Sequence, residues 1–255
     1  MSELDLLGAA RRRPLVRAPG LPLAGASAAA DKGLRPTLKV VCLGGHPDDP
    51  ESGCAGTLAR YIAAGHAATV IYLTRGERGI EGASDAEAAT IRTAECEAAC
   101  RVMGAKALFA GQINGATEVT RARVEELRLI LAAEEPDVLF THWPIDTNFD
   151  HQAASMLTIS AWSALEPRPQ LYFFEVNTGS QSQGFFPDTY VDITQGIETK
   201  KSALFAHKSQ DGEGIWREHH QVVAAFRGRE AGMEAAEAFV HLSRDSRTAA
   251  LPGES

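Results

Sequence analysis

Short apolar runs alternate with longer segments of helical periodicity over most of the chain. Continuous apolar or β-branched runs are typical of strands covered on both faces, and amphipathic periodicity is typical of helices. The predicted strands are residues 38–43, 67–74, 107–110, 137–142 and 170–176. The predicted helices are residues 52–64, 83–103, 119–135 and 150–165, and the last third, from Ile193, is expected to be largely helical.

This alternation predicts a single-domain α/β fold of the Rossmann-like type. Because strand–helix–strand crossovers join parallel strands, we expect one mostly parallel sheet with helices on both faces. A dinucleotide site is not indicated, because the first turn reads Gly44-Gly45-His46 rather than G-x-G-x-x-G, and the two aspartates that follow would repel a pyrophosphate.

The two ends of the chain differ in composition from the middle. Residues 1–36 contain an arginine cluster followed by an Ala/Leu/Gly/Pro stretch, an order that resembles a degenerate twin-arginine export signal or else a disordered tail. Residues 243–255 are expected to be a flexible tail, which leaves 37–242 for the folded domain. Localisation therefore stays open between the cytoplasm and export through a twin-arginine-type signal.

Composition narrows the classes of partner. The chain has 255 residues, 44% of them hydrophobic and 23% charged, and a formal net charge of -8. An acidic chain is a poor match to nucleic acid, whose partners normally carry a basic surface. No apolar stretch approaches the roughly 20 residues that a membrane-spanning helix needs. The four cysteines are scattered, and we interpret them as small core residues.

Candidate chemistry begins directly after the first predicted strand, in the stretch "HPDDPESGC". Here His46, Asp48 and Asp49 stand where a buried strand ends. Adjacent carboxylates repel each other, and their burial is costly unless a cation compensates. The simpler interpretation of two aspartates before a helix is an N-cap with a charged first turn.

A second cluster follows the strand predicted at residues 137–142. The stretch "HWPIDTNFDHQAAS" contains His142, Asp146, Asp150 and His151. In a parallel sheet, ligands bind at the carboxyl ends of the strands, so the two clusters are expected to face one crevice.

Two histidines and one carboxylate leave a coordination position for water on zinc, which is typical of a catalytic site. From the residues alone, one of Asp48 and Asp49 would be a ligand and the other a general base.

These motifs resemble the PIG-L/LmbE-like family of zinc-dependent N-acetylglucosaminyl deacetylases. The resemblance starts at "HPDDPESGCAGTLARYIAAGH", continues through "VIYLTRGERG" and "IRTAECEAACRVMGA", and includes "HWPIDTNFDHQAAS". It covers roughly residues 38–242, and it implies one deacetylase domain over residues 37–242.

The resemblance implies a role for each matching residue. His46, Asp49 and His151 would hold one Zn2+, with Fe2+ as an alternative, and Asp48 would be the general base. The reaction would be hydrolysis of the N-acetyl amide of an N-acetylglucosamine-type conjugate by a water activated on the zinc. Arg92 would contact the sugar. Assembly into a homo-oligomer is compatible with the sequence.

One position departs from the family pattern. Many members carry a histidine three residues before the last metal histidine, and this chain has Asn148 there. An amide can donate a hydrogen bond to an oxyanion but has no proton to transfer at neutral pH. Asp150 would then orient Asn148 or a water, or support His151, and His142 and His207 are further candidates near the site.

This departure keeps two rival functions open. One is a catalytically weakened relative that binds metal and sugar, and the other is an amidase for a different amide conjugate.

Overall fold

The computed structural model describes residues 37–242. The two segments predicted to be tails, residues 1–36 and 243–255, lie outside the described part, so the interpretation of the first as an export signal stays a prediction. No helix within residues 37–242 combines the length and the apolar character that a membrane crossing requires.

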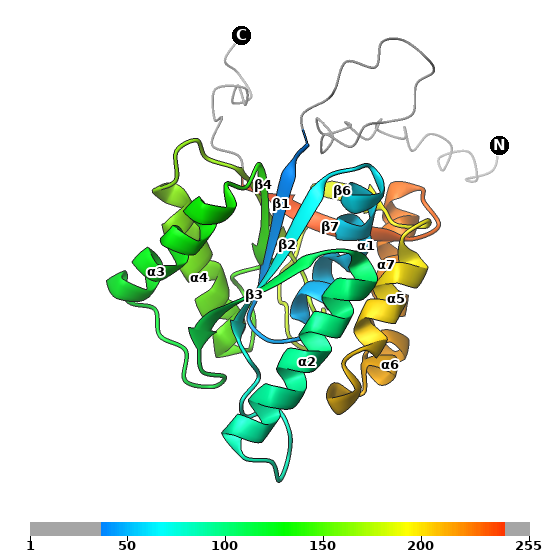
Figure 1. Cartoon of the computed structure of the whole chain (residues 1–255). Helices are drawn as coiled ribbons and strands as arrows, with labels where there is room; N and C mark the ends of the chain where they lie inside the picture. Colours follow the sequence, from blue (N-terminus) through cyan, green and yellow to red (C-terminus); the bar gives the residue numbers. More distant parts are fainter. Residues whose placement is uncertain (1–36, 243–255) are drawn as a thin grey trace, which may run out of the picture.

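The described residues form one seven-stranded sheet with the strand order β3-β2-β1-β4-β5-β7-β6 (Figure 1). Strands β1 to β5 run parallel, and β7 lies antiparallel between β5 and β6. The expectation of a mostly parallel α/β sheet is confirmed. The strands are β1 Lys39–Gly44, β2 Ala67–Thr74, β3 Lys106–Gln112, β4 Val138–His142, β5 Gln170–Phe174, β6 Thr189–Asp192 and β7 Ala236–His241.

Helices cover both faces of this sheet. Helices α3 and α4 lie together on one face, and α1, α2 and α5 pack on the other, as Figure 1 shows. The α-helices are α1 Asp49–Ala63, α2 Asp85–Met103, α3 Arg121–Glu134, α4 Phe149–Ser163, α5 Ile197–Phe205, α6 Gly212–Ile215 and α7 Gln221–Ala231. A short 3-10 turn, η1 Lys208–Gln210, precedes α6, and a π-helical turn, η2 Trp216–His220, follows it.

The core consists of two apolar layers separated by the sheet. Alternate residues of β1 point into different layers: Val40 and Cys42 pack with α1 and α2, whereas Val41 and Leu43 pack with α3 and α4. All four are at most 1% exposed, which is why the strand reads as an uninterrupted apolar run.

The part of the chain from Ile193 is largely helical, as expected, but it ends in a strand that was not predicted. Residues 236–241, which lie in an Ala/Glu-rich stretch of good helix formers, are the strand β7. Burial outweighs helix propensity here, because Phe239 is fully buried against Phe140 of β4 and Tyr172 of β5. Strand β6, which has four residues, was also not predicted.

The strand order determines where a site can form. From β1 the chain continues to β2 and β3 on one side of the sheet, and β4 and β5 lie on the other side of β1. The sheet therefore has its topological switch point between β1 and β4, and ligands of such sheets bind outside the carboxyl ends of the strands at this point. Both polar motifs follow these two strands.

Candidate metal centre

The turn between β1 and α1 is tight and carries the first motif. A Cβ at Gly44 would come within 2.5 Å of the Pro50 ring, so glycine is required for the close approach. The Asp49 carboxylate accepts a hydrogen bond of 2.7 Å from the backbone N–H of His46, which folds the turn onto itself. Helix α1 begins at Asp49, three residues earlier than predicted, and therefore both aspartates lie at its positive end.

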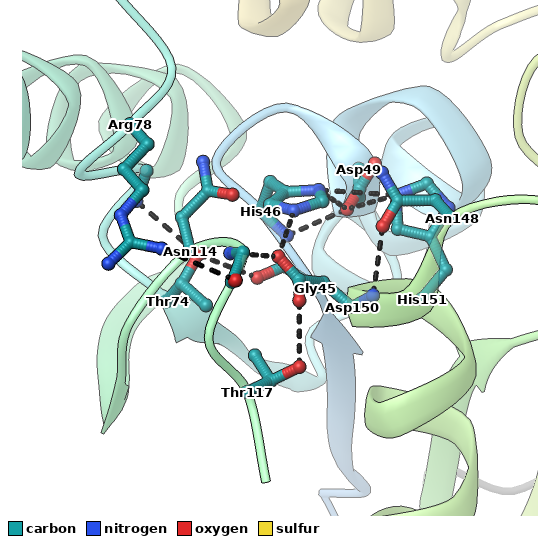
Figure 2. A network of polar contacts seen from close by, with 12 residues as sticks. Gly45, His46, Asp49, Thr74, Arg78, Asn114, Thr117, Asn148, Asp150 and His151 are labelled. Atoms are coloured by element: carbon teal, nitrogen blue, oxygen red, sulfur yellow. Dashed lines mark hydrogen bonds and ion pairs between the residues drawn. The ribbon is translucent and has the colours of Figure 1, made fainter.

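Three donor atoms from the two motifs meet at the switch point. His46 Nδ1, Asp49 Oδ2 and His151 Nε2 form a triangle in which each pair of atoms is 3.2 Å apart (Figure 2). These are the three residues of the described part whose donor atoms lie close enough together to share a metal ion. The convergence of the two clusters, on which the sequence hypothesis depended, is thus present.

The other nitrogen of each imidazole faces a carboxylate. His46 Nε2 is 2.9 Å from Asp150 Oδ2, and His151 Nδ1 is 3.2 Å from Asp146 Oδ1. Such contacts fix the tautomer and turn the remaining ring nitrogen towards a metal.

The Asp150 carboxylate therefore contacts His46. The sequence had suggested other partners for this carboxylate, namely the side-chain amide of Asn148 or the ring of His151. Asp150 also accepts hydrogen bonds from the Gly115 N–H and the Thr117 hydroxyl, which connect it to the loop after β3 (Figure 2).

Burial and neighbouring charges shift the pKa values of the residues in the cluster. Burial alone would raise the pKa of Asp49, but His151 and His142 lower it well below its usual value. Burial alone would lower the pKa of His46, yet hydrogen bonds to Asp150 and Asp49 raise it to about 9. The pKa of His151 is raised to about 10, against the effect of burial, by Asp49 and Asp146. The carboxylates thus favour positive charge at the two imidazoles, and the imidazoles keep the Asp49 carboxylate ionised.

The donor set fits zinc. A tetrahedral zinc ion with ligands at about 2.0–2.1 Å has ligand atoms roughly 3.3 Å apart, close to the observed triangle. The set contains two imidazole nitrogens and one carboxylate oxygen, and each imidazole has its carboxylate partner. Iron(II) accepts the same donor types.

Asp48 lies beside the triangle in an unusual backbone conformation. Its φ is 98°, in the left-handed region that non-glycine residues rarely adopt. Its carboxylate Oδ2 is 3.1 Å from the guanidinium of Arg92. Burial raises the pKa of Asp48 to about 6, and Arg92 opposes that rise.

Asn148 is the N-cap of α4. Its side-chain oxygen accepts a hydrogen bond of 2.9 Å from the Asp150 N–H, which leaves the amide nitrogen of Asn148 available to the pocket that the residue lines. Helix α4 in this way places Asn148, Asp150 and His151 within its first turn.

Two histidines that sequence analysis considered lie behind the site rather than in the pocket. His142 is fully buried, stacks on His151 with ring centroids 4.2 Å apart, and accepts a hydrogen bond from the Gly45 N–H. Burial lowers its pKa to about 4, so the ring is neutral. His207 is also fully buried, 3.5 Å from the Glu51 carboxylate.

The cluster opens into a pocket of about 250 Å³. Apart from the charged residues, side-chain amides make up most of the pocket wall. Each amide offers both hydrogen-bond donors and an acceptor. They come from the loops after β3, β4 and β5 and from η1: Asn114, Asn148, Asn177, Gln181 and Gln210. Sequence analysis missed all except Asn148. The signal that could have revealed several of them is position, because they follow the carboxyl ends of strands.

Comparison with known proteins agrees with this architecture. Residues 41–162 match the family model PIG-L, described as GlcNAc-PI de-N-acetylase. Diacetylchitobiose deacetylase of Thermococcus kodakarensis is 28% identical over 218 residues, which cover 78% of this chain and 81% of the relative. The 4-oxalmesaconate hydratase of Pseudomonas putida is 25% identical over 215 residues, 77% of this chain and 82% of the relative.

A solved structure shows the same fold. The conserved protein TT1542 from Thermus thermophilus superposes with a TM-score of 0.70 and 27% identity, covering 86% of this chain and all (100%) of that protein. The fold and the site thus define an α/β domain with a His–Asp–His cluster at its switch point. The chain thus resembles the PIG-L/LmbE-like family.

Proposed function

We propose that this protein is a metal-dependent hydrolase that removes the N-acetyl group from an N-acetylglucosamine-type conjugate, with zinc as the metal. The observation that carries the proposal is the triangle of His46 Nδ1, Asp49 Oδ2 and His151 Nε2, with 3.2 Å between each pair, inside a pocket that also contains Asp48. The relative from Thermococcus kodakarensis, named as a diacetylchitobiose deacetylase, supports the same chemistry.

The pocket supports the substrate class. A pocket of about 250 Å³ lies just below the roughly 300–1,000 Å³ of sites for drug-sized ligands, which suits one sugar ring. Hydroxyl groups both donate and accept hydrogen bonds, and the five side-chain amides in its wall do the same. The rest of the conjugate would then extend out of the pocket.

Each residue has a defined task in the proposed reaction. A bound zinc ion supplies a positive charge that acidifies water to a pKa of roughly 7 and polarises a carbonyl oxygen. The Asp48 carboxylate would accept the proton of the attacking water and return it to the departing amine. The amide nitrogen of Asn148 would donate a hydrogen bond to the acetyl oxygen as negative charge develops on it.

The direct test combines metal analysis with product analysis. We expect the purified protein to contain about one equivalent of zinc and to release acetate and free amine in equal amounts from N,N'-diacetylchitobiose. A chelator should stop the reaction, and added zinc should restore it. Protein that holds zinc and releases no acetate from this or other N-acetylated sugars would contradict the proposal. An inactive protein that gained activity on Asn148→His would instead be the weakened binding relative.

A second candidate is hydration of a carbon–carbon double bond, since the chain also resembles a hydratase over 77% of its length. Substrates with several carboxylates need cationic partners. Arg92 is the one Lys or Arg among the described residues that line the pocket, and its guanidinium already contacts Asp48. This favours a neutral amide. Loss of ultraviolet absorbance from an unsaturated dicarboxylate, without acetate release from sugars, would favour the hydratase.

A further inference from the structure

The geometry points to a positioning role for Arg92: we propose that it clamps the left-handed Pro47–Asp48 turn and thereby aims the Asp48 carboxylate into the pocket. The inference rests on the proposed function, since it assigns Arg92 to the residue proposed as general base. It replaces the sugar contact that family resemblance implied for Arg92.

The turn needs an external support. Asp48 has a φ of 98°, and a non-glycine residue in a sparsely populated region of this kind costs about 1–3 kcal/mol. The Asp48 side chain makes no capping hydrogen bond to helix α1, although Asp48 occupies the N-cap position. The usual local compensation for such a residue is therefore missing.

Arg92 provides that support from helix α2. One guanidinium nitrogen, Nη2, donates to the Pro47 carbonyl oxygen at 2.6 Å and contacts Asp48 Oδ2 at 3.1 Å. These two acceptors belong to consecutive residues, one in the backbone and one in a side chain. A single rigid group thus fixes the peptide before Asp48 and the direction of its carboxylate at once. The Arg92 side chain is 3% exposed, so it has little freedom to move away.

The loop after β2 is shaped around this guanidinium. A Cβ at Gly76 would lie 2.5 Å from Arg92 Nη1, and a Cβ at Gly79 would lie 2.3 Å from it. The loop is closed by a hydrogen bond from the Gly79 N–H to the Gly76 carbonyl, and Gln210 donates to the Gly79 carbonyl. Any side chain at these positions would displace the guanidinium. The glycines of "TRGERG" are thereby explained as a cradle for Arg92.

The test separates positioning from substrate binding by steady-state kinetics on N,N'-diacetylchitobiose with zinc-loaded protein. Arg92→Ala should lower kcat by about 10²-fold, the size of effect that a misplacement of roughly 1 Å can cause. KM and zinc content should change little, whereas the unfolding temperature should fall, because a buried guanidinium and its contacts with Pro47 and Asp48 are lost. Millimolar guanidinium chloride should restore part of kcat in Arg92→Ala, because the cradle is still present. A rise in KM with kcat retained, or unchanged kinetics, would overturn the inference.

Further variants keep the test decisive if Arg92→Ala does not fold. Arg92→Lys retains the charge, but the shorter lysine side chain ends before the position of Nη2 and cannot keep both contacts, so kcat should still fall. Gly79→Ala has no positive φ to disturb and should displace the guanidinium, lowering kcat in the same direction. Arg75→Ala is the matched control: Arg75 also contacts α2, through Thr93, but is exposed, and its loss should leave kcat unchanged.

A structural readout is independent of the reaction. In a crystal structure of Arg92→Ala, the φ of residue 48 should leave the left-handed region or its carboxylate should turn out of the pocket. If both stay in place, the clamp is wrong whatever the enzyme hydrolyses. If the turn collapses but wild type releases no acetate from any N-acetylated sugar, the clamp stands and the proposed function fails.

Discussion

The two helices that supply the site begin in different ways. Helix α4 starts at an ordinary N-cap: Asn148 is extended, with φ -93° and ψ 124°, and its own side chain caps the helix. The N-cap of helix α1 is Asp48, whose backbone is in the left-handed region and whose side chain makes no capping hydrogen bond. Both helices follow neighbouring parallel strands, and both contribute atoms that could hold a metal ion.

The two helix starts are stabilised in different ways. The α4 turn is satisfied locally, so its geometry follows from its own sequence. The α1 turn is strained and depends on Arg92 from a helix that begins more than thirty residues later in the chain. Backbone strain of this kind persists only where the surrounding structure enforces it. Here the strained residue is Asp48, the proposed general base.

Removal of a donor atom from the α1 side is expected to have the largest effect. Asp49→Ala should abolish both zinc binding and acetate release, because it leaves two imidazoles without the carboxylate between them. Elemental analysis and the acetate assay measure this. The control is Asp85→Ala, which removes an exposed aspartate from the first turn of α2 that is not among the residues lining the pocket. Zinc retained at wild-type level in Asp49→Ala would exclude Asp49 as a ligand.

Removal of the proposed base should separate metal binding from turnover. Asp48→Gly suits this test because glycine adopts a φ of 98° without steric cost. We expect zinc content and the unfolding temperature to be kept, while kcat falls by about 10²–10⁴-fold, as for loss of a general base. An Asp48→Gly enzyme with wild-type kcat would disprove the assigned mechanism.

On the α4 side of the site, variants of Asn148 can separate the stability of the helix from turnover. Asn148→Ser keeps a capping oxygen but removes the amide nitrogen, so the helix should stay intact while kcat falls by about 10²–10³-fold. Asn148→Ala should show the same kinetic loss and, in addition, a stability lower by about 1 kcal/mol. If Asn148→Ser turns over like wild type, Asn148 has no part in the reaction and acts only as a cap.

The smallest effects are expected for the carboxylates behind the histidines. Asp150→Asn and Asp146→Asn should each weaken zinc affinity by about 10–100-fold and leave some activity at saturating zinc. Competition with a chromophoric chelator measures the affinity. Each carboxylate also accepts two further hydrogen bonds, Asp150 from Gly115 and Thr117 and Asp146 from Asn148 and Ser182, so both variants should lower the unfolding temperature. Unchanged zinc affinity in both variants would show that the imidazoles are oriented by packing alone.

Sequence patterns predicted the parallel half of the fold well and the antiparallel edge poorly. Strand β2 was predicted at its observed residues, 67–74, because a β-branched run that is covered on both faces has little alternative. Strand β7 was missed, since its two alanines and Glu237 favour a helix and only long-range pairing with β5 and β6 makes it a strand. Local preference is a weak guide where tertiary burial decides.

The chain by itself placed two candidate clusters after neighbouring parallel strands, where they share one crevice, and resemblance to a known family then chose His46, Asp49 and His151 as the candidate ligands. Only the tertiary structure decided what supports them. Asp150 pairs with His46, and Arg92 turns towards the backbone of Pro47. These partners lie on different elements, and no periodicity along a chain encodes which of several nearby polar groups will satisfy a buried one. That choice is made by packing.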